Sequence, residues 1–134
     1  MGVPEATTVR TVTTNSNSVS FSLRQRIQLS WMHVSYASDA TVGDRQIELV
    51  LKDESGNVLA DWISQDTQAA SLTRHYSFQG GVYRESTFVS GEIQIAIPNI
   101  LIIEPNWSLT IEDGSAVPVS AGDDITYAYQ GVVG

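Results

Sequence analysis

Residues 41–62 restrict the fold of this chain more than any other stretch, because they have the pattern of a β-hairpin. Ile47, Leu49 and Leu51 alternate with polar residues, which is the period of two of a strand with one buried face. The sequence DESG follows at residues 53–56, with the aspartate and the glycine that a type I turn prefers at its two ends. A glycine there accepts a positive φ and permits a bulge that returns the chain. We therefore predict two antiparallel strands joined by this turn.

Alternating apolar residues recur along the rest of the chain and predict about eight or nine strands, with no convincing helix. The clearest of these strands are defined by Val19, Phe21 and Leu23; by Ile93, Ile95 and Ile97; by Trp107, Leu109 and Ile111; and by Ile125, Tyr127 and Tyr129. Strands at spacings of about 8–12 residues are typical of a sandwich, jelly roll or barrel. We predict an all-β fold, a single-domain antiparallel β-sandwich of jelly-roll-like form. The predicted core includes Ile47, Leu49, Leu51, Ile93, Ile95, Leu109 and Ile111.

The strand predicted around Trp31 changes the parity of its apolar residues. Ile27, Leu29 and Trp31 share one parity, and the apolar residues that follow them, Met32, Val34 and Tyr36, share the other. Such a change predicts either a bulge near Trp31 or burial of both faces. Because Trp31 and Trp107 share parity with aliphatic neighbours, we expect both of them in the core.

The segments between and after the strands are predicted as loops. Residues 64–70 are polar, residues 83–87 have no strand pattern, and residues 131–134 are expected to trail off after the last strand.

A chain of 134 residues suits one domain. We divide it into residues 1–14, an N-terminal arm or edge strand, and residues 15–134, the β-sandwich domain. The first segment is rich in Thr and Val, and Pro near its start confines it to an edge or an extended arm. Val9 and Val12 flank Arg10 there, and we predict these three residues as partner contacts by strand addition to a neighbour. An ordinary first strand of the same domain is the alternative.

The net charge of −8 argues against nucleic acid as a partner. Phosphate backbones are held by clustered Lys and Arg, whereas no basic residue follows Arg84 and acidic residues continue to Asp124. We expect the acidic C-terminal half to form a solvated surface. No apolar run approaches the roughly 20 residues of a membrane span, and the N-terminus lacks the pattern of a targeting segment.

No residue is predicted to be catalytic, to bind a cofactor or to hold a metal. The chain has no cysteine and two histidines, His33 and His75, and no serine lies in a G-x-S-x-G motif. Two acidic groups are the better places for a calcium ion. They are Asp53, Glu54 and Asn57, and Glu112, Asp113, Asp123 and Asp124. Acidic residues in turns usually serve the turn instead.

The aromatic residues leave a second kind of binding open. Trp31, Trp62 and Trp107, with five tyrosines, could supply a platform on which a sugar stacks. The alternative is that they fill the core of the sandwich. A flat exposed strip of tryptophans would separate the two.

Several phrases of this sequence resemble a known group of proteins. They are ATVGDRQI at residues 40–47, DESGNV at residues 53–58, AASLTRHY at residues 69–76, and the apolar stretches on either side of EPNW at residues 104–107. Over roughly residues 40–125 the chain resembles small β-sandwich virion structural proteins of tailed bacteriophages. Within that group it is most similar to a capsid decoration, or cement, protein.

This resemblance implies a non-enzymatic protein that binds the outside of a phage capsid and stabilises it by bridging shell subunits. It implies a homotrimer, the major capsid protein as partner, synthesis in the host cytoplasm, and location on the capsid surface of the virion. Unpaired edges at residues 2–14 and 131–134 would supply self-association. The alternatives are a carbohydrate- or host-receptor-binding module, and a head–tail adaptor or fibre-associated virion protein.

Overall fold

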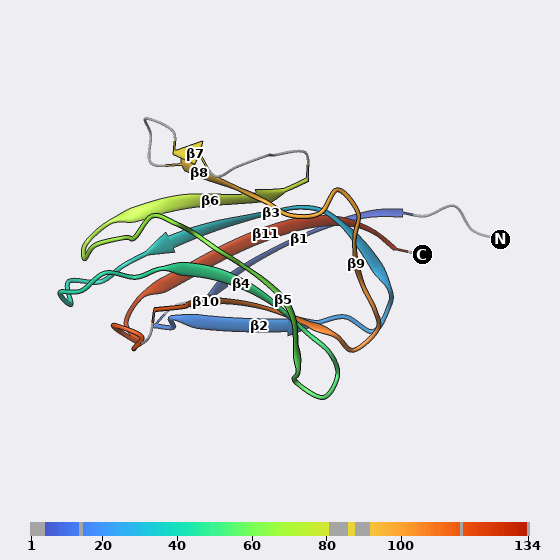
Figure 1. Ribbon diagram of the computed structural model, residues 1–134, viewed down its shortest axis with the longest axis horizontal. Coiled ribbons are helices and arrows are strands. Elements are labelled where there is room, and N and C mark those ends of the chain that lie inside the picture. The colour runs from blue at the N-terminus through green and yellow to red at the C-terminus, as the bar shows by residue number, and fades with distance from the viewer. Residues whose placement is uncertain (1–4, 14, 81–85, 88–91, 116, 134) are drawn as a thin grey trace.

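The computed structural model describes residues 5–13, 15–80, 86–87, 92–115 and 117–133, with the backbone alone at residues 5–13, 86–87 and 92. All of the regular structure in these residues is β, and it forms two sheets that pack face to face (Figure 1). The predicted all-β sandwich is therefore confirmed. In the described part of the chain, no helix is long and apolar enough to cross a membrane.

The larger sheet has seven strands and the smaller has four. In spatial order the large sheet contains β1 (Glu5–Thr13), β11 (Asp124–Val133), β3 (Ile27–Ala37), β6 (Thr73–Gln79), β8 (Glu92–Ala96) and β7 (Ser86–Thr87), while β9 (Leu101–Ile103) also pairs with β3. The small sheet contains β2 (Ser18–Ser22), β10 (Ser108–Asp113), β4 (Ile47–Lys52) and β5 (Val58–Ile63). Among the strands that the structure describes, every pairing is antiparallel except that of β6 with β8, so the large sheet is mixed.

The predicted hairpin is formed by β4 and β5. Leu49 lies opposite Trp62, and Gly56 has the positive φ, 84°, that the turn requires. The carboxylate of Asp53 accepts hydrogen bonds from the backbone N–H groups of Ser55 and Asn57, at 2.9 Å each. The turn chemistry of the sequence therefore sets the hairpin, and a register shift between Leu51 and Lys52 adds the bulge.

The parity change in β3 is confirmed as a bulge. The register of β3 against β11 shifts between Gln130 and Gly131, which face Trp31 and Leu29. Because of this shift, the buried residues change from one parity to the other along the strand. The expectation that Trp31 lies in the core is wrong. Its half-buried side chain lies on the outer face, where the indole N–H donates to Gln130 Oε1 at 3.0 Å.

The C-terminal residues do not trail off as expected. Strand β11 continues to Val133, with β3 on one side and β1 on the other. The β-branched residues Val132 and Val133 favour this extended structure. Gly131 permits the close approach of the chains at the bulge, because a Cβ atom there would lie 2.3 Å from Ile27 Cδ1. The prediction that residues 131–134 offer an unpaired edge is therefore wrong for Gly131 to Val133.

The loop predictions have mixed outcomes. The polar segment 64–70 is a loop with one bridge, between Arg45 and Gln68. Ser86 and Thr87, predicted within a loop, form β7 and pair with β8. Residues 83–85 of that prediction lie outside the described residues.

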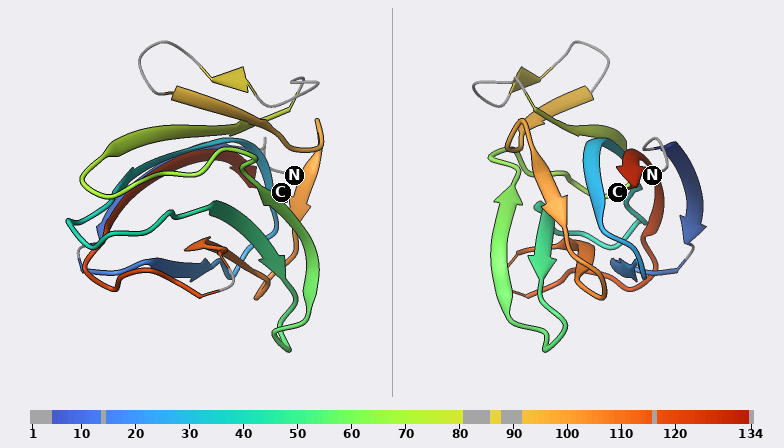
Figure 2. Two further views of the ribbon diagram at one scale, coloured as in Figure 1. Left: turned by 60° about the vertical axis from the view of Figure 1, so that its left-hand side comes forward. Right: turned by 90° about the vertical axis from the view of Figure 1, so that its right-hand side faces the viewer.

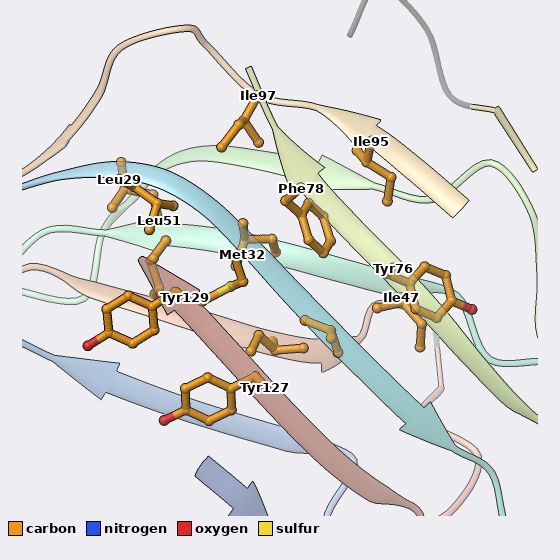
Figure 3. Close-up of a cluster of buried hydrophobic side chains, with 14 of the residues drawn as sticks. Leu29, Met32, Ile47, Leu51, Tyr76, Phe78, Ile95, Ile97, Tyr127 and Tyr129 are labelled. Carbon is orange, nitrogen blue, oxygen red and sulfur yellow. The ribbon is translucent and has the colours of Figure 1, made fainter. Parts of the chain in front are cut away.

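The core lies between the two sheets and is lined by the alternating residues of both (Figure 3). All seven residues predicted for it are buried: Ile47, Leu49, Leu51, Ile93, Ile95, Leu109 and Ile111. Phe21 stacks on Tyr127 and Tyr129, with ring centroids 5.1 and 4.9 Å away, and so joins the edge strand β2 to β11. The core is continuous from one sheet to the other.

Candidate functional site

The most extensive polar site in the described chain is centred on Arg45, in the loop before β4 at one end of the sandwich (left in Figure 1). The Arg45 side chain is 0% exposed. Its Nε and Nη2 donate to the two oxygens of Asp123, at 3.0 Å each, and Nη2 also donates to Asp39 Oδ1 at 2.8 Å. Nη1 donates to the carbonyls of Thr41 and Gly43 at 2.9 and 2.8 Å. All the N–H groups of the guanidinium are therefore used.

A second layer of side chains ties this ion pair to the large sheet. Tyr36 Oη donates to Asp123 Oδ2 at 2.7 Å. Gln68 Nε2 donates to the carbonyls of Tyr36 and Leu72 at 2.8 and 2.9 Å, and Gln68 Oε1 accepts from Tyr76 Oη at 2.8 Å. We call the group Arg45, Asp123, Asp39, Tyr36, Gln68 and Tyr76 the Arg45 clamp. It joins the loops that precede β4, β6 and β11.

The electrostatics of the Arg45 clamp favour a fixed ion pair. The hydrogen bond from Arg45 to Asp123 raises the pKa of the guanidinium, although burial opposes this. Burial, together with the hydrogen bond to the Asp123 carboxylate, raises the pKa of Tyr36 far above its ordinary value. Among the described residues, no buried side-chain nitrogen or oxygen lacks a hydrogen-bond partner. This arrangement holds the loops together.

Sequence reasoning missed the Arg45 clamp. The solvated surface expected of the acidic C-terminal half includes Asp123 and Asp113, yet these residues are 0% and 3% exposed. That expectation is wrong for both residues, because each carboxylate is surrounded by donors that replace water. Two of the phrases that carry the family resemblance lie at the Arg45 clamp. Residues 40–47 contain Arg45, and residues 69–76 follow Gln68 directly and contain Tyr76. These phrases were the available signal, although their spacing in sequence did not show that they meet.

The two acidic groups considered for calcium are not assembled as metal sites. Asp53 serves the hairpin turn, and Asp123 belongs to the Arg45 clamp. Asp113 accepts from the backbone N–H groups of Gln46, Ser115 and Val119. Burial opposes ionisation of Asp113, but these hydrogen bonds and that of the Ser115 hydroxyl lower its pKa. In the ranges that the structure describes, no three His, Asp or Glu side chains are arranged to hold a metal ion.

The two histidines lie together on the outer face of the large sheet. The rings of His33 on β3 and His75 on β6 stack, with centroids 5.4 Å apart and planes inclined by 23°. Ser35 Oγ lies 2.8 Å from His75 Nδ1. A serine beside a histidine is part of a nucleophilic site, but a base also requires a group that orients it, and the described side chains place none on His75. Sequence spacing did not reveal this pair, because it arises from the β3–β6 register.

The tryptophans do not form the strip that a sugar platform would need. Trp31 lies on the outer face of the large sheet, whereas Trp62 and Trp107 pack against the core. Trp107 Nε1 also donates to Glu54 Oε2 at 3.1 Å. The three rings therefore face different surroundings.

The predicted contact residues lie on β1, at the margin of the large sheet (Figure 2, right). The backbones of Val9, Arg10 and Val12 pair with Tyr129, Ala128 and Thr126 of β11. Among the described strands, β11 is the only one that pairs with β1, so the other side of β1 faces no described strand. The structure thus places these residues on an edge strand that is paired within its own domain.

Comparison with known proteins identifies no family. No protein-family model matches the chain, and no curated protein matches it. Three of the similar solved structures are PfGH50B, the MgGH51 α-L-arabinofuranosidase with bound arabinose, and the Gx strain of infectious bursal disease virus. Their identities are 15%, 14% and 10%, and their TM-scores 0.44, 0.34 and 0.32. Each similarity covers 98% of this chain, but this chain spans only 22%, 22% and 40% of those structures. Similarity this low supports no inference about function.

Proposed function

We propose that this protein is a non-enzymatic structural protein of a tailed-bacteriophage virion, and that it decorates the outside of the capsid. The observation that carries this proposal is the sequence resemblance across residues 40–125, together with the place its phrases take in the fold. Arg45 and Thr41 come from the first phrase and Gly56 from the second, and they hold a buried loop junction and a hairpin turn. The resembling residues are therefore ones that specify this sandwich.

The absence of catalytic function is part of the proposal. The buried charged side chains that the structure describes, Arg45, Asp113 and Asp123, are engaged in hydrogen bonds that join loops. A catalytic acid or base needs a pKa suited to proton exchange and access to a substrate. The ion pair at the centre of the Arg45 clamp has neither property, since Arg45 and Asp123 are both 0% exposed and each is held by several hydrogen bonds. Structural cohesion is the role that fits it.

In this proposal the protein stabilises the shell by bridging subunits of the major capsid protein. Bridging requires at least two contact surfaces, and each sheet of a sandwich has edges that can pair with another chain. The edge strand β1, with Val9, Arg10 and Val12, is the proposed contact that follows from the sequence. We further propose a homotrimer, a form taken from the resemblance, which is made in the host cytoplasm and located on the capsid surface.

The test is the abundance of the protein in purified particles. Quantitative mass spectrometry should give a copy number that scales with that of the major shell protein. A few copies per particle would instead indicate a head–tail adaptor or a fibre-associated protein, and complete absence from particles would refute a virion role.

A binding experiment then tests attachment. Capsids assembled without the protein should gain heat resistance when it is added. Arg10→Glu should weaken attachment, while Arg24→Glu, at an exposed position outside the strands, should not. Equal attachment by both variants would exclude Arg10 as a contact.

A further inference from the structure

Strand β5 is an apolar edge of the small sheet. Among the described strands it pairs with β4 alone, and it lies at the outer margin of the molecule (Figure 2, right). Val58, Leu59 and Ile63 of this strand are 60%, 46% and 38% exposed. Proteins usually protect such edges with charges, prolines or covering loops, because an exposed apolar edge pairs with other chains. The opposite edge, β2, differs in that its exposed residues are serines.

The outer face beside β5 carries an excess of negative charge. Asp61 of β5 is exposed, and the neighbouring strand β4 places Glu48 on the same face. Glu48 in turn lies directly opposite Glu112 of β10. Burial, followed by the hydrogen bond and the charge of Asp61, raises the pKa of Glu48 to about 7, with a smaller contribution from Glu112. Lys52 opposes this shift, but it does not balance three carboxylates. A further cation at Asp61 would relieve the repulsion.

We propose that β5 binds an extended segment of a partner protein by strand addition, and that this segment is apolar and carries a Lys or Arg beside Asp61. Backbone hydrogen bonds along β5 would supply affinity, and alternate side chains would supply specificity. Apolar partner residues would cover Leu59 and Ile63, which lie on the same face as Asp61. The partner is defined by its chemistry alone, so the inference does not depend on the proposed function.

A second copy of this chain does not satisfy the same chemistry. In an antiparallel pair, residues that lie directly opposite each other project to the same face. A two-fold pairing of β5 centred on Asp61 would set two Asp61 side chains opposite each other, next to both copies of Glu48. A pairing centred on Ala60 would set Asp61 opposite Leu59. The first arrangement repels, and the second places a carboxylate against an apolar side chain, so a different, basic chain is the better occupant.

The test uses a synthetic peptide in which valine and lysine alternate, and two control peptides. One control has glutamate in place of lysine, and the other has N-methyl groups on alternate amides, which prevent strand pairing. Hydrogen–deuterium exchange should show new protection of the β5 amides with the lysine peptide and none at β2. Fluorescence anisotropy should show weaker binding of both controls.

Variants of the protein locate the contact. Asp61→Asn should weaken binding of the lysine peptide about two- to fivefold, as expected for an exposed charge pair. Asp61→Lys should reverse the preference and favour the glutamate peptide. Leu59→Lys should abolish the protection of β5, whereas Ile100→Lys, at an apolar position that is 65% exposed and lies outside the strands, should not. Circular dichroism establishes that each variant is folded.

Three results would overturn the inference. Equal binding of the N-methylated peptide would exclude strand addition, and protection at β1 or β2 in place of β5 would identify another edge. A dimer of the protein alone, with its β5 amides already protected, would make a second copy the occupant.

Discussion

Replacement of Arg45 by Met tests whether the Arg45 clamp holds the fold together. Arg45 and Asp123 are each 0% exposed, so loss of the guanidinium leaves a buried carboxylate without its counter-charge. Breaking a buried ion pair by removing one partner costs about 3–5 kcal/mol. Asp123 would keep the hydrogen bonds from Tyr36 Oη and the Asp39 N–H, but the carbonyls of Thr41 and Gly43 would lose their donor. We therefore expect Arg45→Met to lower the free energy of unfolding by about 3–5 kcal/mol, out of the roughly 5–15 kcal/mol typical of a domain.

Urea denaturation followed by tryptophan fluorescence measures this cost, with an unchanged m-value as evidence that the unfolded state is unaltered. The matched control is Arg26→Met. Arg26 pairs with Glu104 at 3.1 Å, but the two side chains are 48% and 42% exposed, so the expected cost is at most about 1 kcal/mol. The double variant Arg45→Met with Asp123→Leu should recover part of the loss, because it removes the unpaired charge as well. If Arg45→Met costs no more than Arg26→Met, the clamp does not stabilise the fold in the way we describe.

Three further predictions concern the core, the carboxylates and the bulge. Leu49→Ala should cost about 2–5 kcal/mol in urea denaturation, since Leu49 is 0% exposed and its loss leaves a cavity; a cost below about 0.5 kcal/mol would contradict its place in the core. The pKa of Glu48 is raised from 4.5 to about 7 by burial and by Asp61, so the stability linked to its protonated form is present below pH 4.5 and lost as the pH rises through about 7. Glu48→Gln should remove this loss, and a pH profile of unfolding identical to that of the unmodified protein would contradict it. Gly131→Ala should cost about 1–3 kcal/mol by overpacking against Ile27, and a thermal melt that shows no change would mean that Ile27 can move aside.

The sequence predicts the strands of this fold better than their partners. Alternation at Ile47, Leu49 and Leu51 identifies a half-buried strand because successive side chains point to opposite faces. The parity change at Trp31 even locates a bulge. Pairing depends instead on contacts between distant segments, which alternation does not encode. The parallel pairing of β6 with β8, and the position of β11 between β1 and β3, were therefore not predicted.

The polar site was not predictable for a related reason. Arg45 and Asp123 are 78 residues apart, and each lies in a polar loop where a solvated side chain is the ordinary expectation. Only the topology, which brings the loops before β4 and β11 to the same end of the sandwich, buries both. Likewise, Leu59 and Ile63 look like residues of an ordinary return strand, and the strand order shows that they lie on an edge.

Four carboxylates of the described residues divide into two groups by their effect on the fold. Asp39, Asp53 and Asp113 accept hydrogen bonds from nearby N–H and hydroxyl groups that lower their pKa, so at neutral pH their ionised forms stabilise the folded state. Glu48 behaves in the opposite way, because burial and its acidic neighbours make its ionised form costly. Departures from local rules in natural proteins are concentrated at functional sites. Glu48 lies beside the strand that also exposes three apolar side chains. An exposed apolar edge and a repulsion among carboxylates therefore coincide at β5, and a basic, apolar partner strand would cover the first and reduce the second.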